Sequence, residues 1–370
     1  MKRRMFVLFC TLVVSLPLSA AEHIKPFIMP SARAAGFGGI HAAQGDDFSS
    51  LFSNPASFVD IEKEFSAAEL SFTMYGPVFE ILDLLVSEGD STDISSLVEP
   101  GGFSAGVEVG GPLSLGYVGN GLGMGVFSRA VMDVTANSSR FRPVGSGEIL
   151  FLGGYSMRAL EKDVHKLDLG FVAKGFYRGS IDMESSIFDI TEAFDDISSN
   201  AYQAQFGVGL DLGAKYTWNN TFSAALVAYD AFSPALVTGY DSFKHRKSGK
   251  QHYATVTPRL AVGGLYRVQS DFLARYIDDL VLMFDYRDLL DYAVAEIPRN
   301  PVLQVSLGAE VRFLKILSLR AGMAEALPAV GFGLDMTILK FDVAVRGKEL
   351  GLDPGVQSVY TIDIGLLFRY

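Results

Sequence analysis

Residues 202–218 read YQAQFGVGLDLGAKYTW, and every second residue of this stretch, from Tyr202 to Trp218, is apolar. The positions between them hold glycine and polar residues, including Asp211 and Lys215. A two-residue period places the two sets on opposite faces of a β-strand. The stretch is much longer than the about 5–6 residues of an ordinary strand and exceeds the about 9–11 that cross a membrane. It therefore predicts a membrane-spanning strand with an apolar outer face and a polar inner face.

The same alternation recurs along most of the chain. It is clear at residues 166–178, 303–313 and 340–346. We expect fourteen strands, near residues 64–75, 103–118, 121–134, 147–158, 165–178, 202–218, 220–230, 254–268, 279–287, 302–313, 316–324, 329–338, 340–346 and 357–370. The predicted fold class is all-β, a transmembrane antiparallel β-barrel of about 14 strands.

The connections between these strands alternate in length. Short turns are expected around Asn120, Glu161, Asn219, Lys315 and Leu339, and longer loops at 76–102, 135–146, 179–201, 231–253 and 288–301. Outer-membrane barrels have this asymmetry, with the short turns on the periplasmic side. An even number of strands then places both chain termini in the periplasm. The pattern predicts an outer-membrane location in a Gram-negative-type or spirochaetal cell envelope.

Residues 1–21 have the pattern of a secretory signal peptide. Basic residues at positions 2–4 precede an apolar run that extends to Leu18, and small residues precede the expected cleavage after Ala21. An uncleaved helical anchor is the alternative, but it needs about 20 apolar residues. The single cysteine, Cys10, lies in this run. The mature chain then has no cysteine for a disulfide or for thiolate chemistry.

The composition narrows the class of protein further. The 370 residues include 38 glycines, 28 phenylalanines and 15 tyrosines, and the mean hydropathy is +0.26. No stretch after the signal approaches the length of a membrane helix, so the apolar residues must be distributed over strands. The net charge of −11 argues against nucleic acid as a partner, because phosphate binding requires clustered Lys and Arg. The five histidines form no H-E-x-x-H motif, and we expect no metal, cofactor or catalytic residue.

The predicted last strand ends the chain on an aromatic residue. Apolar residues occupy every second position from Tyr360 to Tyr370. Such an ending is common in barrel proteins and resembles the signal that the barrel assembly machinery reads. That machinery and outer-membrane lipid are therefore expected partners. The alternative is that this is the last strand of an ordinary secreted protein, but such a strand would not require an aromatic residue at the end of the chain.

Residues 31–58, SARAAGFGGIHAAQGDDFSSLFSNPASF, fit neither a strand nor a membrane-spanning helix. Their position between the signal and the first strand suggests a plug inside the barrel lumen. We assign residues 22–62 to this N-terminal hatch and residues 63–370 to the transmembrane barrel. Glycines in the segment would permit close approach to the wall, namely Gly36, Gly38 and Gly39.

Both ends of the chain resemble a known family. Residues 32–39 (ARAAGFGG), the pair Asp46-Asp47 and residues 51–56 (LFSNPA) resemble the start of FadL-like outer-membrane proteins, particularly an uncharacterised spirochaetal branch and the related PorV group. Residues 347–351 resemble the same branch.

The resemblance implies a fourteen-stranded barrel whose hatch includes one motif, here Asn54, Pro55 and Ala56. Ser57 stands where the family often has glycine, which leaves the tight turn less certain. The implied function is hatch-gated diffusion of long-chain fatty acids or other small hydrophobic compounds. A PorV-like role in protein interaction or secretion is the alternative.

Two sets of barrel residues are candidates for handling such a ligand. The sequence Gly110-Gly111-Pro112 interrupts the second strand, where a bulge could either open the wall for lateral release or only add curvature. Four inward-facing cations could contact a ligand carboxylate or pair with internal acids such as Glu310, and the need to pair confined charges favours the second interpretation: Lys174, Arg267, Arg312 and Arg320. Apolar residues near 79–86 and 187–194 could form loop helices that capture the ligand or pack against other loops.

A serine hydrolase is the remaining alternative. Residues 102–106 (GFSAG) match the G-x-S-x-G pattern. The pattern requires a strand-to-helix turn, whereas this match opens a predicted membrane strand. We therefore expect no enzymatic activity.

Overall fold

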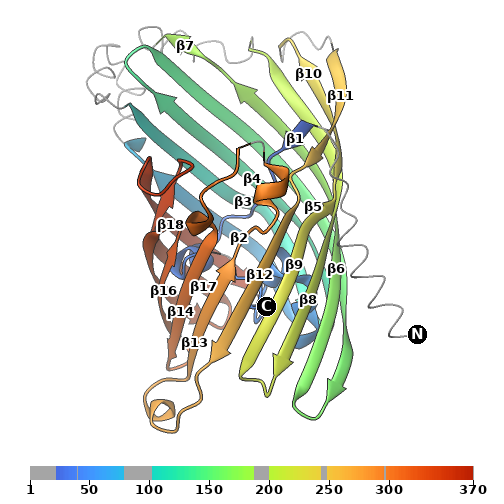
Figure 1. Cartoon of the computed structure of the whole chain (residues 1–370), viewed down its shortest axis with the longest axis vertical. Coiled ribbons are helices and arrows are strands. Elements are labelled where there is room, and N and C mark those ends of the chain that lie inside the picture. Colours follow the sequence, from blue (N-terminus) through green and yellow to red (C-terminus); the bar gives the residue numbers. More distant parts are fainter. Residues whose placement is uncertain are drawn as a thin grey trace.

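The computed structural model describes residues 22–39, 41–78, 102–186, 200–242, 248–295 and 297–369. The described strands form one tall barrel (Figure 1). The predicted signal peptide, the two predicted loop helices and the terminal Tyr370 lie outside the described residues.

Fourteen antiparallel strands close the wall, which confirms the predicted all-β barrel. Each strand pairs with the next along the chain, and the last pairs with the first. They are β2 (Glu64–Tyr75), β3 (Phe103–Gly119), β4 (Leu122–Ala136), β5 (Arg140–Lys162), β6 (His165–Asp182), β8 (Tyr202–Trp218), β9 continued by β10 (Phe222–Phe232 and Pro234–Tyr240), β11 continued by β12 (Ser248–Val256 and Arg259–Arg267), β13 (Asp279–Tyr286), β14 (Val305–Phe313), β15 (Leu317–Ala324), β16 (Leu327–Met336), β17 (Leu339–Glu349) and β18 (Ser358–Arg369).

The two faces of β8 follow the predicted alternation. Phe206 is 62% exposed and Trp218 is 51% exposed on the outer face. Asp211 and Lys215, on the inner face, are each 7% exposed. The apolar outer face suits lipid, and the inner polar side chains are covered by what fills the barrel.

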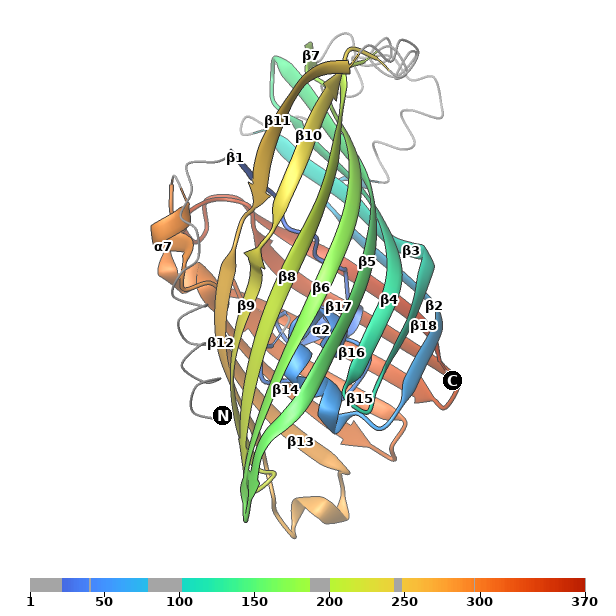
Figure 2. The same ribbon diagram turned by 90° about the vertical axis from the view of Figure 1, so that its right-hand side faces the viewer.

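The wall is high on one side and low on the other (Figure 2). Strand β5 has 23 residues, whereas β15, on the far side, has 8. Long loops were predicted at 135–146 and 231–253, and both predictions were wrong. Only residues 137–139 separate β4 from β5, and β10 and β11 occupy most of 231–253. In the upper part of β5, Gly145, Ser146 and Gly147 interrupt the apolar alternation, while the backbone ladder with β4 continues to the buried Phe141.

Short turns gather at one end of the barrel, here called the turn end, opposite the loop end (Figure 1). Asn219 and Asn220, between β8 and β9, have φ of 52° and 53°. The connection comprises residues 219–221, and the Thr221 N–H donates to the Trp218 carbonyl at 3.0 Å. The type I′ turn that this bond closes requires positive φ at both central positions, which asparagine tolerates. Among the described residues, no helix is long and apolar enough to cross a membrane.

Strand β1 (Glu22–Ile24) pairs in parallel with β11. Among the described pairings, β13 pairs with β12 but not with β11. The edge of β11 on that side is therefore free to pair with β1. The backbone N–H of Thr257 donates to the carbonyl of Ile24 at 3.1 Å. The first described residues therefore join the wall in its upper half, nearer the loop end.

Residues 25–39 and 41–61, the interior segment, lie inside the barrel (Figure 2). The segment contains α2 (Ala32–Gly36), α3 (Ser50–Ser53) and the 3-10 helix η1 (Pro55–Asp60). Helix α2 contacts β15 to β18, whereas η1 contacts β3 to β6 and β8. Because these strands lie on opposite sides, the segment spans the lumen. Phe37 and Phe58 are among its fully buried side chains.

Candidate functional site

Helix α2 carries an arginine into the lumen. The Ser31 hydroxyl accepts a hydrogen bond from the Ala34 N–H at 3.3 Å and so caps the helix. This places Arg33, which is 5% exposed, against the wall strand β14. Its Nη2 lies 2.9 Å from Oε1 of Glu310, and its Nη1 lies 3.0 Å from Oδ1 of Asp46 and also contacts Asp47.

Wall residues extend this contact into a network, here called the charged dock. Arg320 donates to Glu310 at 2.7 Å and to Asp342 at 2.5 Å. Arg312 bridges Asp46 and Glu310, and Lys340 lies 2.6 Å from Asp47. The charged dock thus comprises four cations and four carboxylates: Arg33, Arg312, Arg320, Lys340, Asp46, Asp47, Glu310 and Asp342.

The charges in the interior segment are stabilised as ions. Burial would raise the pKa of Asp47, but Arg33 and Lys340 outweigh burial and hold this pKa well below its usual range. Burial would lower the pKa of Arg33, but Asp46, Asp47 and Glu310 raise it well above its usual range. Removal of one partner from such a buried pair strongly destabilises the fold, because it leaves the other charge unpaired.

Two of the three predicted hatch glycines touch the wall beside the charged dock. A Cβ on Gly36 would lie 2.9 Å from the Cα of Gly331 in β16. A Cβ on Gly38 would lie 2.8 Å from two wall carbonyl oxygens, and its φ of +89° also favours glycine. Gly39 has φ +121° and more space, with its nearest contact at 3.7 Å. The charged dock therefore coincides with close backbone contact.

On the opposite wall, the turn at Asn54-Pro55-Ala56 is held by contacts without charge, here called the glycine dock, and Asp60 at the end of η1 adds ion pairs with Arg158 and Lys215. Asn54 is fully buried, accepts from the Ala56 N–H at 2.9 Å and donates to the Ala42 carbonyl at 2.8 Å. A Cβ on Gly213 of β8 would lie 2.2 Å from Oδ1 of Asn54. A Cβ on Gly170 of β6 would lie 2.5 Å from the Pro55 carbonyl. Glycine at both wall positions is what allows the Asn54-Pro55-Ala56 turn to dock.

Ser57, which replaces the family's more usual glycine, fits this turn. It is fully buried, and a Cβ on Gly45 would lie only 2.0 Å from its Oγ. The glycine at position 45 therefore provides the space that the Ser57 hydroxyl occupies.

Two further contacts tie the interior segment to the wall between the docks. Nδ1 of the buried His41 contacts the carboxylate of Asp285 in β13, which also accepts from the Ala42 N–H at 2.7 Å. The Tyr229 hydroxyl of β9 donates to the Ser53 carbonyl.

The wall is interrupted at the predicted kink. The pairing of β2 with β3 shifts register between Ser66 and Ser71, and the pairing of β3 with β4 shifts between Gly110 and Ser114. Gly111 has φ +90°, and a Cβ there would lie 2.4 Å from the Glu69 carbonyl. The residues Gly110-Gly111-Pro112 thus form a bulge, which removes ladder pairing at this point.

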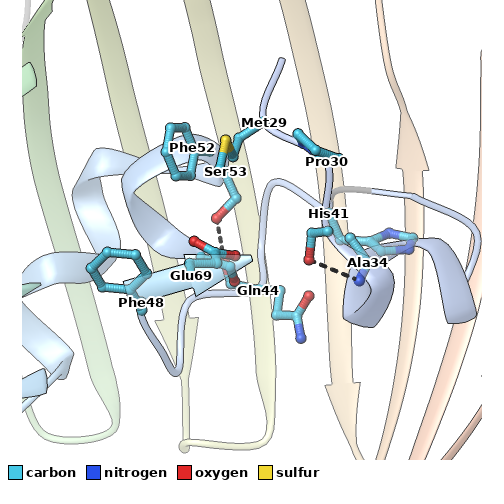
Figure 3. A pocket seen from close by; sticks show the side chains of 11 residues that line it. Met29, Pro30, Ala34, His41, Gln44, Phe48, Phe52, Ser53 and Glu69 are labelled. Carbon is cyan, nitrogen blue, oxygen red and sulfur yellow. Dashed lines mark hydrogen bonds between the residues drawn. The ribbon is translucent and has the colours of Figure 1, made fainter. Parts of the chain in front are cut away.

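A cavity lies beside this interruption, between the interior segment and β2 (Figure 3). Its volume is about 30 Å³, and a second cavity of about 40 Å³ adjoins it and shares Glu69. A Cβ on Gly110 would lie 2.8 Å from Cε of Met29, which lines the first cavity. Each volume accommodates only a few water molecules. An apolar ligand could use this space only after the interior segment or its side chains move.

The four predicted cations all have acidic partners. Arg312 and Arg320 belong to the charged dock. Lys174 lies elsewhere, 2.7 Å from Asp211 and 2.6 Å from Asp230. Arg267 is 44% exposed near the turn end and lies 3.6 Å from Asp279. The structure does not bring the four cations together. Each pairs with an acidic residue, which is the second of the two interpretations of these cations.

The G-x-S-x-G match lies on a strand. Ser104 is part of β3, and its hydroxyl accepts from Nε2 of Gln357 at 2.8 Å. The residues are not at the strand-to-helix turn that a nucleophile elbow requires. No cluster of metal-ligating side chains is present in the described part of the chain.

Sequence reasoning missed the partners of the interior segment. Arg33, Asp46 and Asp47 were noted only for their resemblance to a family, and Glu69 was not singled out. Glu310 and Arg312 do sit two residues apart on one inner strand face, a signal of a charged lumen. The contact of Glu310 with Arg33 spans 277 residues of sequence, and no local pattern can show it.

The barrel has the fold of known hydrophobic-compound channels. A structure titled "TodX deltaS2S3 mutant monoaromatic hydrocarbon channel" aligns with 92% of this chain and 98% of its own at 12% identity and a TM-score of 0.50. The Ralstonia pickettii toluene transporter TbuX aligns with 92% of this chain and 99% of its own at 10% identity and a TM-score of 0.49.

A Pseudomonas aeruginosa FadL homologue aligns with 95% of this chain and 98% of its own at 10% identity and a TM-score of 0.43. No protein-family model and no curated protein matches the sequence. The FadL-like fold expected from the sequence is confirmed.

Proposed function

We propose that this chain, which has a FadL-like outer-membrane transporter fold, carries small hydrophobic compounds across the outer membrane by hatch-gated diffusion. The observation that supports this most is the placement of the interior segment. It fills the lumen between two docks and borders a cavity at an interrupted part of the wall. Movement of the segment would join the cavity to the lumen.

The interruption at Gly110-Gly111-Pro112 supports lateral release as the exit. Ladder pairing between β2 and β3 is absent from residue 67 to residue 70. Met29 and Pro30 of the interior segment close the space behind Gly110. An apolar ligand that left here would enter the membrane without crossing the charged inner surface of the barrel.

The substrate class and the orientation follow from the same proposal. Long-chain fatty acids are one candidate cargo, and the monoaromatic hydrocarbons named for the structural neighbours are another. With the turn end in the periplasm, the loop end faces the exterior and receives the ligand. Assembly into the outer membrane would require the barrel assembly machinery, with lipid around the apolar outer face.

Reconstitution tests the proposal. The refolded chain, verified as a heat-modifiable barrel, should accelerate uptake of toluene and of a fluorescent fatty acid into liposomes. Deletion of residues 22–60 should remove the gate and raise the leak of small solutes. Leucine at Gly110 and Gly111 should slow uptake while the barrel stays folded. Uptake equal to that of empty liposomes would contradict the function, and unchanged uptake by the leucine variant would contradict lateral release alone.

A further inference from the structure

The cavity beside the wall interruption is bordered by a carboxylate, Glu69, one oxygen of which has no hydrogen-bond partner among the described residues. Glu69 lies on β2 opposite Leu367 of β18, within the stretch where β2 and β3 are unpaired. Its side chain borders both cavities, and Figure 3 shows it at the first. Its Oε2 is buried and makes no hydrogen bond in the described part of the chain. A carboxylate oxygen in this situation is costly unless it meets a donor.

The rest of the first cavity suits an apolar body with one polar head. Its apolar lining comes from the interior segment: Met29, Pro30, Ala34, Phe48 and Phe52. Its lining includes no lysine or arginine, and His41 is already committed to Asp285. Arg33 and Lys340 border only the second cavity, where both contact Asp47. A ligand carboxylate would thus meet Glu69 without an available cation.

We propose that this cavity binds small apolar compounds that carry a hydrogen-bond donor, a hydroxyl or an ammonium group, with Glu69 as the acceptor. The inference rests on the proposed function and names its ligand class. Hydrogen bonds to a carboxylate are short and strong, and they strengthen where water is excluded. Two carboxylates at one confined site repel each other. The site therefore discriminates against acids, in contrast to a pocket built for fatty-acid head groups.

The position of Glu69 gives the head group a defined place. The Glu69 backbone carbonyl lies against Gly111 at the bulge, where a Cβ would come within 2.4 Å. A ligand bound to the side chain would have its polar end at the interruption. Its apolar body would displace Met29 and Phe52, whose side chains can change rotamer.

Four probes with one ring test the inference: toluene, benzyl alcohol, benzylamine and benzoate. Dissociation constants for the refolded chain would be measured by ligand-observed NMR titration at about pH 9, where even a buried glutamate is largely ionised. Benzyl alcohol and benzylamine should bind about tenfold more tightly than benzoate. In Glu69→Gln the preference for benzylamine over benzoate should fall to about twofold or less. Glu184→Gln removes an equal charge at an exposed pair with Arg140 and should keep the wild-type ratio.

The outcomes separate the two proposals. Binding of benzoate as tight as that of the alcohol and amine would overturn the ligand class and leave hydrophobic transport standing. A preference that persists in Glu69→Gln would overturn the role of Glu69. Failure of all four probes to bind would contradict the transport proposal itself. If Glu69→Gln does not refold, the ranking of the four probes on the wild-type chain still decides the ligand class.

Discussion

The interior segment is held to opposite walls by two different kinds of contact. In the charged dock, ion pairs join Arg33, Asp46 and Asp47 to β14 and β17. In the glycine dock, an uncharged turn lies against backbone at Gly170 and Gly213. The charged dock depends on complete pairing, since an unpaired buried charge is costly. The glycine dock depends on space, since close-packed backbone tolerates no added atoms. The two docks should therefore fail under different changes.

Removal of Arg33 should have the largest effect. Arg33→Ala would leave Asp46, Asp47 and Glu310 without a shared cation, at a cost of about 3–5 kcal/mol. The interior segment should leave the β14–β17 wall and become accessible to protease, while uptake rises. Urea unfolding and limited proteolysis would measure both effects. Arg142→Ala breaks the exposed pair with Asp182 and should leave stability near the wild-type value. Equal stability losses in the two variants would contradict the charged dock.

Added volume should break the glycine dock. Gly170→Leu would drive a side chain into the Pro55 carbonyl and should cost about 1–3 kcal/mol. Amide exchange at residues 54–60 should accelerate, whereas exchange in α2 should change little. Gly175→Leu, on the same strand with nothing within 4 Å of its Cβ, is the matched control. Protection of residues 54–60 that survives Gly170→Leu would show that the turn does not depend on this contact.

Loss of the Asn54 side chain should weaken the same dock more mildly. Asn54→Ala removes the bonds to Ala56 and Ala42 and should cost about 1–2 kcal/mol. Thermal unfolding of the refolded barrel would measure the loss. Asn137→Ala removes a similar cap in an exposed turn and should cost less. Equal losses of stability in the two variants would show that the burial of Asn54 does not strengthen its hydrogen bonds.

Lowering the pH should have the smallest of these effects, and it should weaken the charged dock rather than the Asn54-Pro55-Ala56 turn. The pKa values of Asp46 and Asp47 are lowered in the folded chain, so their contribution is complete above the ordinary aspartate pKa of about 3.9 and is lost as pH falls below it. Protease protection of α2 should hold at neutral pH and weaken only in stronger acid. Asn54, Pro55 and Ala56 carry no titratable side chain. Loss of α2 protection near neutral pH would contradict this account.

Much of the fold could be predicted from the sequence because lipid imposes a period on each strand. Tyr202–Trp218 has the bounds that its alternation indicates, and β2 likewise matches residues 64–75. The upper part of β5 was missed because Gly145, Ser146 and Gly147 interrupt its period. Strand β10 was missed because Ala235 and Val237, buried on its inner face, are as apolar as Leu236 on its outer face. The break before Pro234 also hid β10, since proline donates no ladder bond.

Less of the site could be predicted, because its contacts join distant residues. Glycine at 36, 38 and 110–111 indicated close approach, and Asn54-Pro55 indicated a turn. The partners of these residues are set by closure of the barrel, which brings Arg33 to Glu310 and Asn54 to Gly213. Glu69 resembles any polar strand residue in sequence. Only the folded structure shows that its Oε2, beside the bulge, lacks a hydrogen-bond partner among the described residues.

A reversible cross-link tests most directly whether the interior segment is a gate. A Cβ on Gly365 of β18 would lie 3.3 Å from Cβ of Ala32 in α2, near the about 3.8 Å of a disulfide. The sequence has one cysteine, Cys10, so in a refolded chain that starts at residue 22, Ala32→Cys with Gly365→Cys would form one defined bond. Oxidation should abolish toluene uptake into liposomes, and reduction should restore it. Equal uptake by the oxidised and reduced forms would contradict hatch-gated transport.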